Sequence, residues 1–297
     1  MTTIIDGRKI ATEIRESLKE EVKTLTSKKG LVPGLAVIII GEDPASQVYV
    51  NMKRKACEQI GLKSFYYPLP ASTSKEELLK IISELNQNKE VNGILAQLPL
   101  PKHLDENIII NQIDPLKDVD CFHPANIGKI MLGDEDGFYP CTPYGCQELI
   151  SRTVPDLKGK HLVVVGRSNI VGKPMINMMI QKNKRANCIV TACHTAAKDI
   201  SYYTKQADIL IVAAGRPKTI TKEMVKKGVV IIDVGVNRIT DPKNASKTKL
   251  VGDVDFEEVA PLSSAITPVP GGVGPMTITM LLKNTIKAFK IQHGINL

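Results

Sequence analysis

A tyrosine and a lysine lie four residues apart in a segment that Asp43 and Pro44 open as a predicted helix start. Residues at this spacing share one helix face, so the side chains of Tyr49 and Lys53 should lie together. The predicted apolar face of this helix consists of Ala45, Val48, Tyr49, Met52, Ala56 and Ile60. Lys53 is expected on the flank of that face. Partial burial lowers the pKa of a lysine, and a neutral amine near pH 7 suits general acid–base catalysis. The alternative is that Lys53 extends from the helix edge into water.

A glycine-containing turn is the second candidate site. The run HLVVVG (161–166) has the pattern of a buried strand, and a GxSxxxG sequence made by Gly166, Ser168 and Gly172 follows before a helix. Such a turn places backbone N–H groups and a helix N-terminus at a phosphate group. The alternative is a strand–helix turn that needs glycine only for packing. Because the turn belongs to a series of strands and helices, we favour a dinucleotide site.

The residues after this turn indicate which dinucleotide is bound. NAD sites usually carry an acidic residue about 20 positions after the glycines. No Asp or Glu occurs from Gly166 to Lys198. Arg167 can pair with a 2′-phosphate through two hydrogen bonds, and His194 and Thr195 at the end of the next strand can donate further ones. We therefore predict NADP rather than NAD. The alternative for His194 is a loop histidine that binds nothing.

Composition limits the class of protein. The chain has 297 residues, 43% hydrophobic and 24% charged, which is typical of two globular domains. Its longest apolar run is roughly six residues, too short for a membrane helix, and no signal peptide precedes it, so we expect a cytoplasmic protein. The net charge of +8 favours anionic partners, but aromatic residues make up only 4%, which favours small anions over nucleic acid.

Metal and disulfide motifs are not recognisable. The six cysteines include no CxxC pair and the five histidines no HExxH motif. We therefore expect free thiols and no bound metal.

The candidate residues are positioned by alternating strands and helices. Predicted strands span 35–41, 63–69, 93–98, 161–166, 188–193, 208–215, 229–236 and 249–254. Several are continuous apolar runs, as expected of parallel strands covered on both faces. This alternation predicts an α/β protein. Residues 113–143 show no period and are predicted as a long functional loop, and residues 266–277 form a second break before a final amphipathic helix.

Several motifs together resemble a known family. They are YVNMK (49–53), GILAQLPLP (93–101), KDVD (117–120), PCTPYGC (140–146), VVVGRSNIVGKP (163–174) and ITPVPGGVGPMT (266–277). In this order they resemble the bifunctional methylenetetrahydrofolate dehydrogenase/cyclohydrolases of the FolD type, over essentially the whole chain.

The resemblance implies an architecture and an activity. It implies a folate-binding catalytic β/α domain (1–145 and 272–297), a Rossmann-like parallel-sheet NADP domain (146–271), a cleft between them, and a C-terminal helix that returns to the first domain. It implies oxidation of 5,10-methylenetetrahydrofolate with NADP, hydrolysis of the methenyl product to 10-formyltetrahydrofolate, a role in one-carbon metabolism and purine supply, and a homodimer in the cytoplasm without nucleic acid or membrane partners.

Residue roles also follow from the resemblance. Lys53 matches the central catalytic group, Tyr49 positions the folate, and Gln97 hydrogen-bonds the lysine. Asp120 matches the residue that binds the pterin ring. Further folate contacts are implied at Leu98, Pro268, Gly271 and Gly272. The implied cofactor contacts are Gly166, Arg167, Ser168, Gly172, His194, Thr195, Gly215 and Val236.

Two positions depart from the family pattern. The family usually reads DVDG, whereas Cys121 follows Asp120 here, so a residue with a Cβ must adopt positive φ or the loop must shift. Thr195 stands where the family often has serine, and Ala196 and Ala197 replace basic residues, so the preference for NADP depends mainly on Arg167.

Two other functions remain open from the sequence. One is a non-enzymatic nucleotide-responsive regulator or basic nucleic-acid binder, which the net charge favours, although no helix-turn-helix pattern or aromatic basic stripe is present. The other is a dehydrogenase without hydrolase activity, against which the set Tyr49, Lys53 and Gln97 argues.

Overall fold

The computed structural model describes residues 1–241 and 244–296, without the side chains of 241–247. Two compact units are formed, each from two stretches of the chain. One contains Met1–Ala11 and Thr142–Thr277, and the other contains Thr12–Cys141 and the residues from Ile278 on. The first is called the sheet unit below because of its six-stranded sheet, and the second is called the lysine unit because it contains Lys53.

The lysine unit is built on a three-stranded parallel sheet in the order β3-β2-β4. Its strands are β2 (Gly34–Ile40), β3 (Lys63–Leu69) and β4 (Gly93–Ala96). The middle strand, β2, is buried along its whole length, which explains its continuous apolar sequence. The strands and their parallel pairing agree with the sequence prediction.

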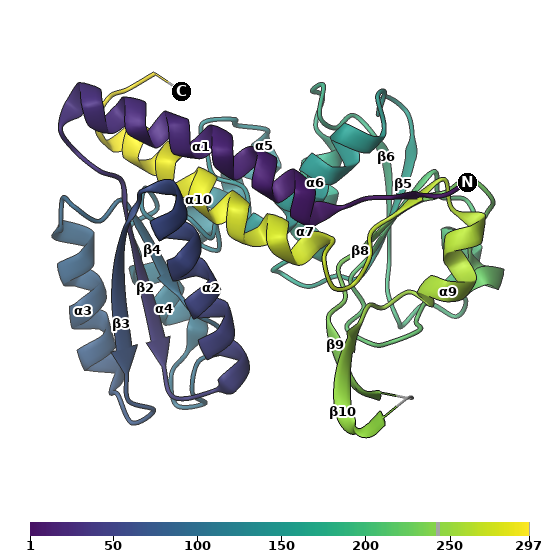
Figure 1. Cartoon of the computed structure of the whole chain (residues 1–297), viewed down its shortest axis with the longest axis horizontal. Coiled ribbons are helices and arrows are strands. Elements are labelled where there is room, and N and C mark those ends of the chain that lie inside the picture. The colour runs from purple at the N-terminus through teal and green to yellow at the C-terminus, as the bar shows by residue number, and fades with distance from the viewer. Residues whose placement is uncertain (242–243, 297) are drawn as a thin grey trace. The chain divides into compact units, whose positions relative to one another are not determined.

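Helices surround this sheet (Figure 1). They are α1 (Gly7–Lys29), α2 (Pro44–Ile60), α3 (Lys75–Gln87), α4 (Glu106–Gln112), α5 (Pro124–Leu132) and α10 (Val273–Gln292). Helices α1 and α10 run side by side, and Arg15 on α1 donates from Nε to Thr279 Oγ1 on α10 at 2.8 Å. The C-terminal helix also holds the edge of the sheet region, because the Gln292 side-chain amide donates to Asn92 O and Leu116 O, at 2.9 Å each. The predicted return of the last helix to the first domain is confirmed.

Helix α2 begins and ends as predicted, but it buries a different face. Asp43 caps it by accepting a hydrogen bond from Ser46 N at 2.7 Å, and Gly61 ends it with φ 85°. The buried residues are Ser46, Val50, Lys53, Ala56, Cys57 and Ile60. The prediction of the buried face was wrong, because Val48 and Met52 are 59% and 46% exposed. Lys53 therefore lies in the middle of the buried face rather than on its flank.

The predicted long loop over 113–143 was wrong in part, since it contains α5. His123 caps this helix by accepting from Ala125 N, Pro124 occupies its first turn, and Gly133 ends it with φ 74°. These are ordinary helix start and stop signals. The helix is short, and its sequence period is too brief to recognise.

The sheet unit contains a six-stranded parallel sheet in the order β1-β11-β8-β7-β5-β6. Its strands are β1 (Thr3–Ile4), β5 (His161–Val165), β6 (Ile189–Cys193), β7 (Ile209–Val212), β8 (Val230–Asp233) and β11 (Ala265–Ile266). Its helices are α6 (Cys141–Thr153), α7 (Gly172–Ile180), α8 (Ser201–Thr204) and α9 (Phe256–Val259), with short 3-10 turns at Lys222–Met224 and Ala260–Leu262. The predicted α/β, Rossmann-like class is confirmed.

One predicted strand of this unit pairs differently. The expected strand over 249–254 ends at Val251 and belongs to an antiparallel hairpin of β9 (Asn237–Asp241) and β10 (Asn244–Val251) (Figure 1). The last residues of the predicted strand, Asp253 and Val254, lie after it. Their backbone N–H groups donate to a side chain, as described below.

The boundaries of the sheet unit and the lysine unit differ from the predicted domain boundaries. Residues 1–11 pack with the sheet unit because β1 pairs with β11 through Thr3 and Ala265.

Among the described residues, no helix is both long and apolar enough to span a bilayer.

A core substitution in β2 should destabilise the lysine unit. Leu35 is 0% exposed, and Leu35→Ala should lower the free energy of unfolding by about 3 kcal/mol, because a cavity adds to the lost burial. Leu31→Ala, at a position 47% exposed, is the matched control and should change it by less than about 1 kcal/mol. Urea unfolding measures both. Equal losses would show that β2 is not the core strand.

Candidate functional site

Lys53 is a lysine held almost entirely out of water. Lys53 is 8% exposed, and its amine Nζ donates a hydrogen bond to Gln97 Oε1 at 2.9 Å. Helix α2 brings it there by packing on β2 and β3. The sequence prediction that this amine is withdrawn from solvent is confirmed.

Gln97 is fixed from both ends, so its oxygen has one orientation. It directly follows β4, where its backbone N–H donates to Ile38 O on the neighbouring strand at 2.8 Å. Its side-chain Nε2 donates to Leu98 O, also at 2.8 Å. The amide oxygen is thereby left to face the amine of Lys53. Leu98 acts here through its carbonyl oxygen.

The electrostatic surroundings of Lys53 balance two opposing effects. Burial lowers the pKa of the amine, and the nearby carboxylate of Asp120 and the thiols of Cys141 and Cys57 partly oppose that shift. The thiol of Cys141 donates to Val119 O at 3.4 Å. Burial and the nearby carboxylate of Asp120 raise the pKa of Cys141 well above its usual value. The thiol therefore stays protonated and acts as a donor. Lys53, Gln97 and Asp120 thus belong to one cluster in the lysine unit.

The loop that carries Asp120 is held by its neighbour Asp118. Asp118 is 2% exposed and accepts hydrogen bonds from Phe122 N, His123 N and Asn126 Nδ2 at 3.2, 2.9 and 2.8 Å. Burial raises the pKa of Asp118, against these three donors. Asp118 is thus the structural aspartate of the motif, and Asp120, which is half-buried, remains available to a ligand.

Cys121 takes the left-handed conformation that glycine usually supplies. Its φ is 62°, and its buried thiol donates to Phe138 O at 3.2 Å. The loop keeps its shape, and a residue with a Cβ bears the strain of positive φ, which was one of the two outcomes the sequence allowed.

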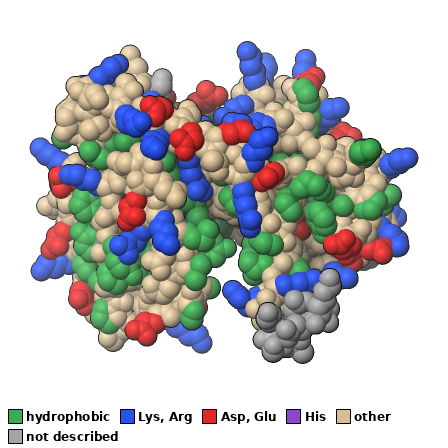
Figure 2. All heavy atoms as spheres, in the orientation of Figure 1, with side chains coloured by type: hydrophobic (Ala, Val, Ile, Leu, Met, Phe, Trp, Pro, Cys, Tyr) green, Lys and Arg blue, Asp and Glu red, His purple; other side chains and the backbone are tan. Residues whose placement is uncertain are grey.

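Tyr49 lies one turn before Lys53 on α2 and is 40% exposed. Figure 2 shows other hydrophobic side chains along this helix. An exposed phenol ring one turn before a buried lysine provides a surface on which a flat aromatic ligand can stack.

The turn between β5 and α7 has the shape that a phosphate site needs. Gly166 has φ 137°, and a Cβ there would overlap Ala213 O, while a Cβ at Gly172 would overlap Gly166 O. The oxygen Ser168 Oγ accepts from Val171 N at 3.0 Å at the start of α7. Residues 167–170, which include Arg167, are all exposed. Glycines that permit the tight turn are thus followed by four successive exposed residues just before a helix N-terminus.

The other predicted cofactor residues meet at the same edge of the sheet. Gly166, His194, Gly215 and Val236 follow β5, β6, β7 and β8, which are adjacent parallel strands. Carboxyl ends of parallel strands share one edge, where open α/β sheets bind dinucleotides. Val236 is 51% exposed, Thr195 is exposed, and the ring of His194 accepts from Ala196 N through Nδ1 at 3.3 Å. These residues fit a dinucleotide bound along this edge.

Three predicted folate residues lie in the sheet unit rather than with Lys53. Pro268, Gly271 and Gly272 follow β11, and Gly271 O accepts from Arg8 N at 3.0 Å. Gly271 has φ 115°, and a Cβ at Gly272 would lie 2.7 Å from the Cβ of Thr267. This loop therefore requires its glycines.

Sequence reasoning missed two side chains that hold the lysine site. Cys141, described above, opens α6. Asn284 on α10 is 1% exposed, and its Nδ2 donates to Val119 O and Tyr139 O at 2.8 Å each. It thereby links the residue before Asp120 to the segment before Cys141. A lone asparagine in an apolar helix was the available signal.

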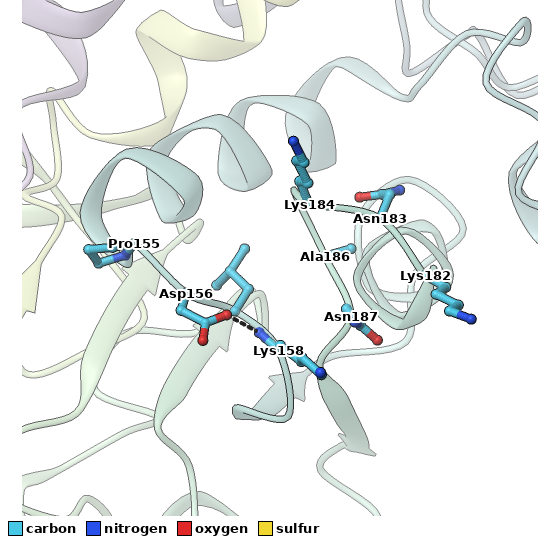
Figure 3. Close-up of a pocket in the computed structure, with 9 residues that line it drawn as sticks. Pro155, Asp156, Lys158, Lys182, Asn183, Lys184, Ala186 and Asn187 are labelled. Carbon is cyan, nitrogen blue, oxygen red and sulfur yellow. Dashed lines mark hydrogen bonds between the residues drawn. The ribbon is translucent and has the colours of Figure 1, made fainter.

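A cavity of about 460 Å³ lies elsewhere, and its residues come from two loops of the sheet unit (Figure 3). It is lined by Pro155, Asp156, Leu157, Lys158, Lys182, Asn183, Lys184, Ala186 and Asn187. These residues precede β5 and β6, so the cavity is at the amino ends of the strands, opposite the edge that carries Gly166. Among the described residues, no cluster of three or more His, Cys, Asp or Glu could hold a metal ion.

The lowered pKa of Lys53 predicts how stability depends on pH. A lysine whose folded-state pKa is depressed destabilises the fold wherever it must be charged, and this penalty shrinks as pH rises toward its unfolded pKa. Lys53→Met keeps a side chain of similar length and removes that charge. The melting temperature of this variant should therefore exceed that of the wild type by more at pH 6 than at pH 9. Thermal melts at both values test this, with Lys55→Met, on the exposed face, as the control. A gap that grows with pH would contradict it.

Two models of one protein family match successive parts of the chain. A model of the tetrahydrofolate dehydrogenase/cyclohydrolase catalytic domain matches residues 5–120, and a model of the NAD(P)-binding domain of the same family matches residues 140–293. The bifunctional protein FolD of Chlorobium phaeovibrioides is 57% identical over 98% of this chain and 99% of its own.

Solved structures agree. The bifunctional FolD enzyme of Campylobacter jejuni has a TM-score of 0.92 and 49% identity, over 98% of this chain and all of that one. The Trypanosoma brucei methylenetetrahydrofolate dehydrogenase-cyclohydrolase, solved with NADP and an inhibitor, has a TM-score of 0.92 and 38% identity over 98% of each chain. The family resemblance found in the sequence motifs is confirmed: the chain belongs to the tetrahydrofolate dehydrogenase/cyclohydrolase family.

Proposed function

We propose that this chain oxidises 5,10-methylenetetrahydrofolate with NADP⁺ and hydrolyses the resulting 5,10-methenyltetrahydrofolate to 10-formyltetrahydrofolate, with Lys53 as the central catalytic group. The observation that carries the proposal is the buried amine of Lys53, oriented by Gln97 and close to Asp120. The product would supply one-carbon units, as purine synthesis needs.

The oxidation needs little acid–base help from the protein. The two nitrogens beside the methylene carbon donate electron density as the hydride leaves, so no strong base is required. NADP⁺ supplies the hydride acceptor when it is bound. The tasks of the chain are then to hold the pterin, through Asp120 and the ring of Tyr49, and to orient the amine of Lys53. A carboxylate such as Asp120 can accept two N–H bonds from the guanidine-like edge of a pterin.

The hydrolysis needs a proton to move, and Lys53 is suited to move it. Water attacks the cationic methenyl carbon and must lose a proton as the C–O bond forms. A buried amine with a lowered pKa has a neutral fraction that can accept this proton. Gln97 Oε1 holds one N–H of the amine, which fixes the direction of its lone pair. The protonated amine can then donate to the folate nitrogen that leaves the carbon.

The choice of NADP over NAD is attributed to Arg167. It is exposed in the turn between β5 and α7, in a stretch without acidic residues, and its guanidinium can pair with a 2′-phosphate. Ser168, Thr195 and His194 are proposed as further polar contacts. Gly166, Gly172, Gly215 and Val236 are proposed to line the dinucleotide with backbone and apolar surface.

The remaining assignments are proposals of the same kind. Residues 1–145 with 272–297 are assigned to folate and residues 146–271 to NADP, and Pro268, Gly271 and Gly272 are proposed to line the folate site. A homodimer is proposed, for which β6 offers an edge of the six-stranded sheet with Ile189 63% exposed. A cytoplasmic location is supported by six cysteines that are all free and buried.

Removing the amine should slow the hydrolysis strongly. Lys53→Met should lower the rate of methenyltetrahydrofolate hydrolysis by about 100-fold or more, because a positioned proton-transfer group contributes that much. Lys55→Met, two residues away and exposed, should leave the rate within about twofold. The absorbance of the methenyl group follows both reactions. A rate for Lys53→Met equal to the wild type would remove Lys53 from the mechanism, and oxidation without any hydrolysis in the wild type would leave only a dehydrogenase.

Removing the guanidinium should reduce discrimination between cofactors. Arg167→Ala should lower kcat/KM for NADP⁺ by about tenfold or more and leave kcat/KM for NAD⁺ nearly unchanged, because only NADP⁺ carries the 2′-phosphate. Lys182→Ala removes a positive charge from the cavity at the other end of the strands and should affect neither value. Equal use of NAD⁺ and NADP⁺ by the wild type would overturn the assignment.

A further inference from the structure

Two carboxylates are buried in the sheet unit, and neither belongs to the predicted site. Asp233 at the end of β8 is 3% exposed, and Asp253 after β10 is 0% exposed. Among the described residues, neither is part of an ion pair. Buried charges without a cation need strong hydrogen-bond donors, so the function of these two is indicated by what they accept.

Asp253 binds the loop that follows β7. Its Oδ2 accepts from two successive backbone groups, Ala214 N at 2.7 Å and Gly215 N at 2.8 Å. Gly215 has φ 70°, so the pair of N–H groups forms a nest of the kind that binds anions. The other oxygen, Oδ1, accepts from Asn237 Nδ2 at 2.8 Å. One carboxylate therefore joins the loop after β7 to the start of β9.

Asp233 holds Asp253 in turn. Its carboxylate accepts from Gly235 N, Asp253 N and Val254 N, each at 3.0 Å. Its own backbone N–H donates to Thr267 Oγ1 at 2.8 Å. Burial raises the pKa of Asp233 to about 7, although the three donors oppose that shift. A partly protonated Asp233 repels the carboxylate of Asp253 less near neutral pH.

The backbone packs tightly against both carboxylates. A Cβ at Gly235 would overlap the carboxylate of Asp253, and a Cβ at Gly252 would overlap that of Asp233. A change in the position of either carboxylate would therefore require the neighbouring backbone to move. The positions of the loops after β7 and β8 are therefore coupled to these two groups.

We propose that Asp253 is a positioning residue for the dinucleotide, which fixes the loops that carry Gly215 and Val236 at the carboxyl edge of the sheet. This inference rests on the proposed binding of NADP to that edge. A carboxylate is needed because it accepts three hydrogen bonds and donates none, whereas an amide would set its own N–H against one of them. Its negative charge would repel a phosphate, and the three N–H donors directed at its carboxylate partly offset that charge.

The experiment uses the fact that only one of the two reactions consumes the dinucleotide. Asp253→Ala should raise the dissociation constant for NADP⁺ by about tenfold or more, and Asp253→Asn, which keeps one acceptor for the nest, by less. Hydrolysis of methenyltetrahydrofolate, which involves no redox change, should stay within about twofold of the wild type in both variants. Asp255→Asn is the matched control, because Asp255 pairs with Lys218 near the surface and should change neither quantity.

Calorimetry with NADP⁺ alone and the hydrolysis assay together decide the outcome. Unchanged NADP⁺ affinity in a folded Asp253→Ala, or parallel loss of affinity and hydrolysis, would overturn the proposal. If the Asp253 variants do not fold, Asn237→Ala, which removes one hydrogen bond from the same carboxylate, must weaken NADP⁺ binding with hydrolysis retained; wild-type affinity in that variant overturns it too. A wild-type protein that does not bind NADP⁺ would instead refute the proposed function.

Discussion

The lysine site depends on burying one amine, that of Lys53, beside an amide oxygen rather than in a close ion pair with a carboxylate. Burial lowers the pKa of the amine, and the nearby carboxylate of Asp120 partly opposes that shift. The hydrogen bond from Lys53 to Gln97 suits this balance, because an amide oxygen accepts from either form of the amine. A carboxylate in place of Gln97 would have held the amine charged.

The rest of the lysine unit serves to maintain that position. Helix α2 is capped at both ends and packs on β2 and β3, which fixes the Cα of Lys53. The backbone of Gln97 is hydrogen-bonded to β2, and Asn284 links the segments before Asp120 and Cys141. Gln97 and Asn284 lie far from the lysine in sequence. The site is therefore a product of tertiary structure rather than of one motif.

The sequence predicted most strands, because continuous apolar runs such as 35–40 identify buried parallel strands directly. It predicted Lys53 and Gln97 through their motifs, but it misjudged which face of α2 is buried. Val48 and Met52 are apolar yet exposed, whereas Ser46 and Lys53 are polar yet buried, so hydrophobic periodicity pointed the wrong way. Such reversals are expected where function requires a polar group inside and an apolar surface outside. Asp233 and Asp253 were missed for a different reason, since most of their hydrogen-bond partners are backbone groups, which leave no pattern in the side chains.

The protonation equilibrium of Lys53 tests the account most directly. Lysine amines labelled with ¹³C or ¹⁵N can be titrated by NMR in the intact protein, with Lys53→Met to assign the signal. The account predicts that the Lys53 amine titrates at a pKa below that of the exposed lysines, because burial disfavours its charge. A Lys53 signal that titrates together with those of the exposed lysines would contradict it.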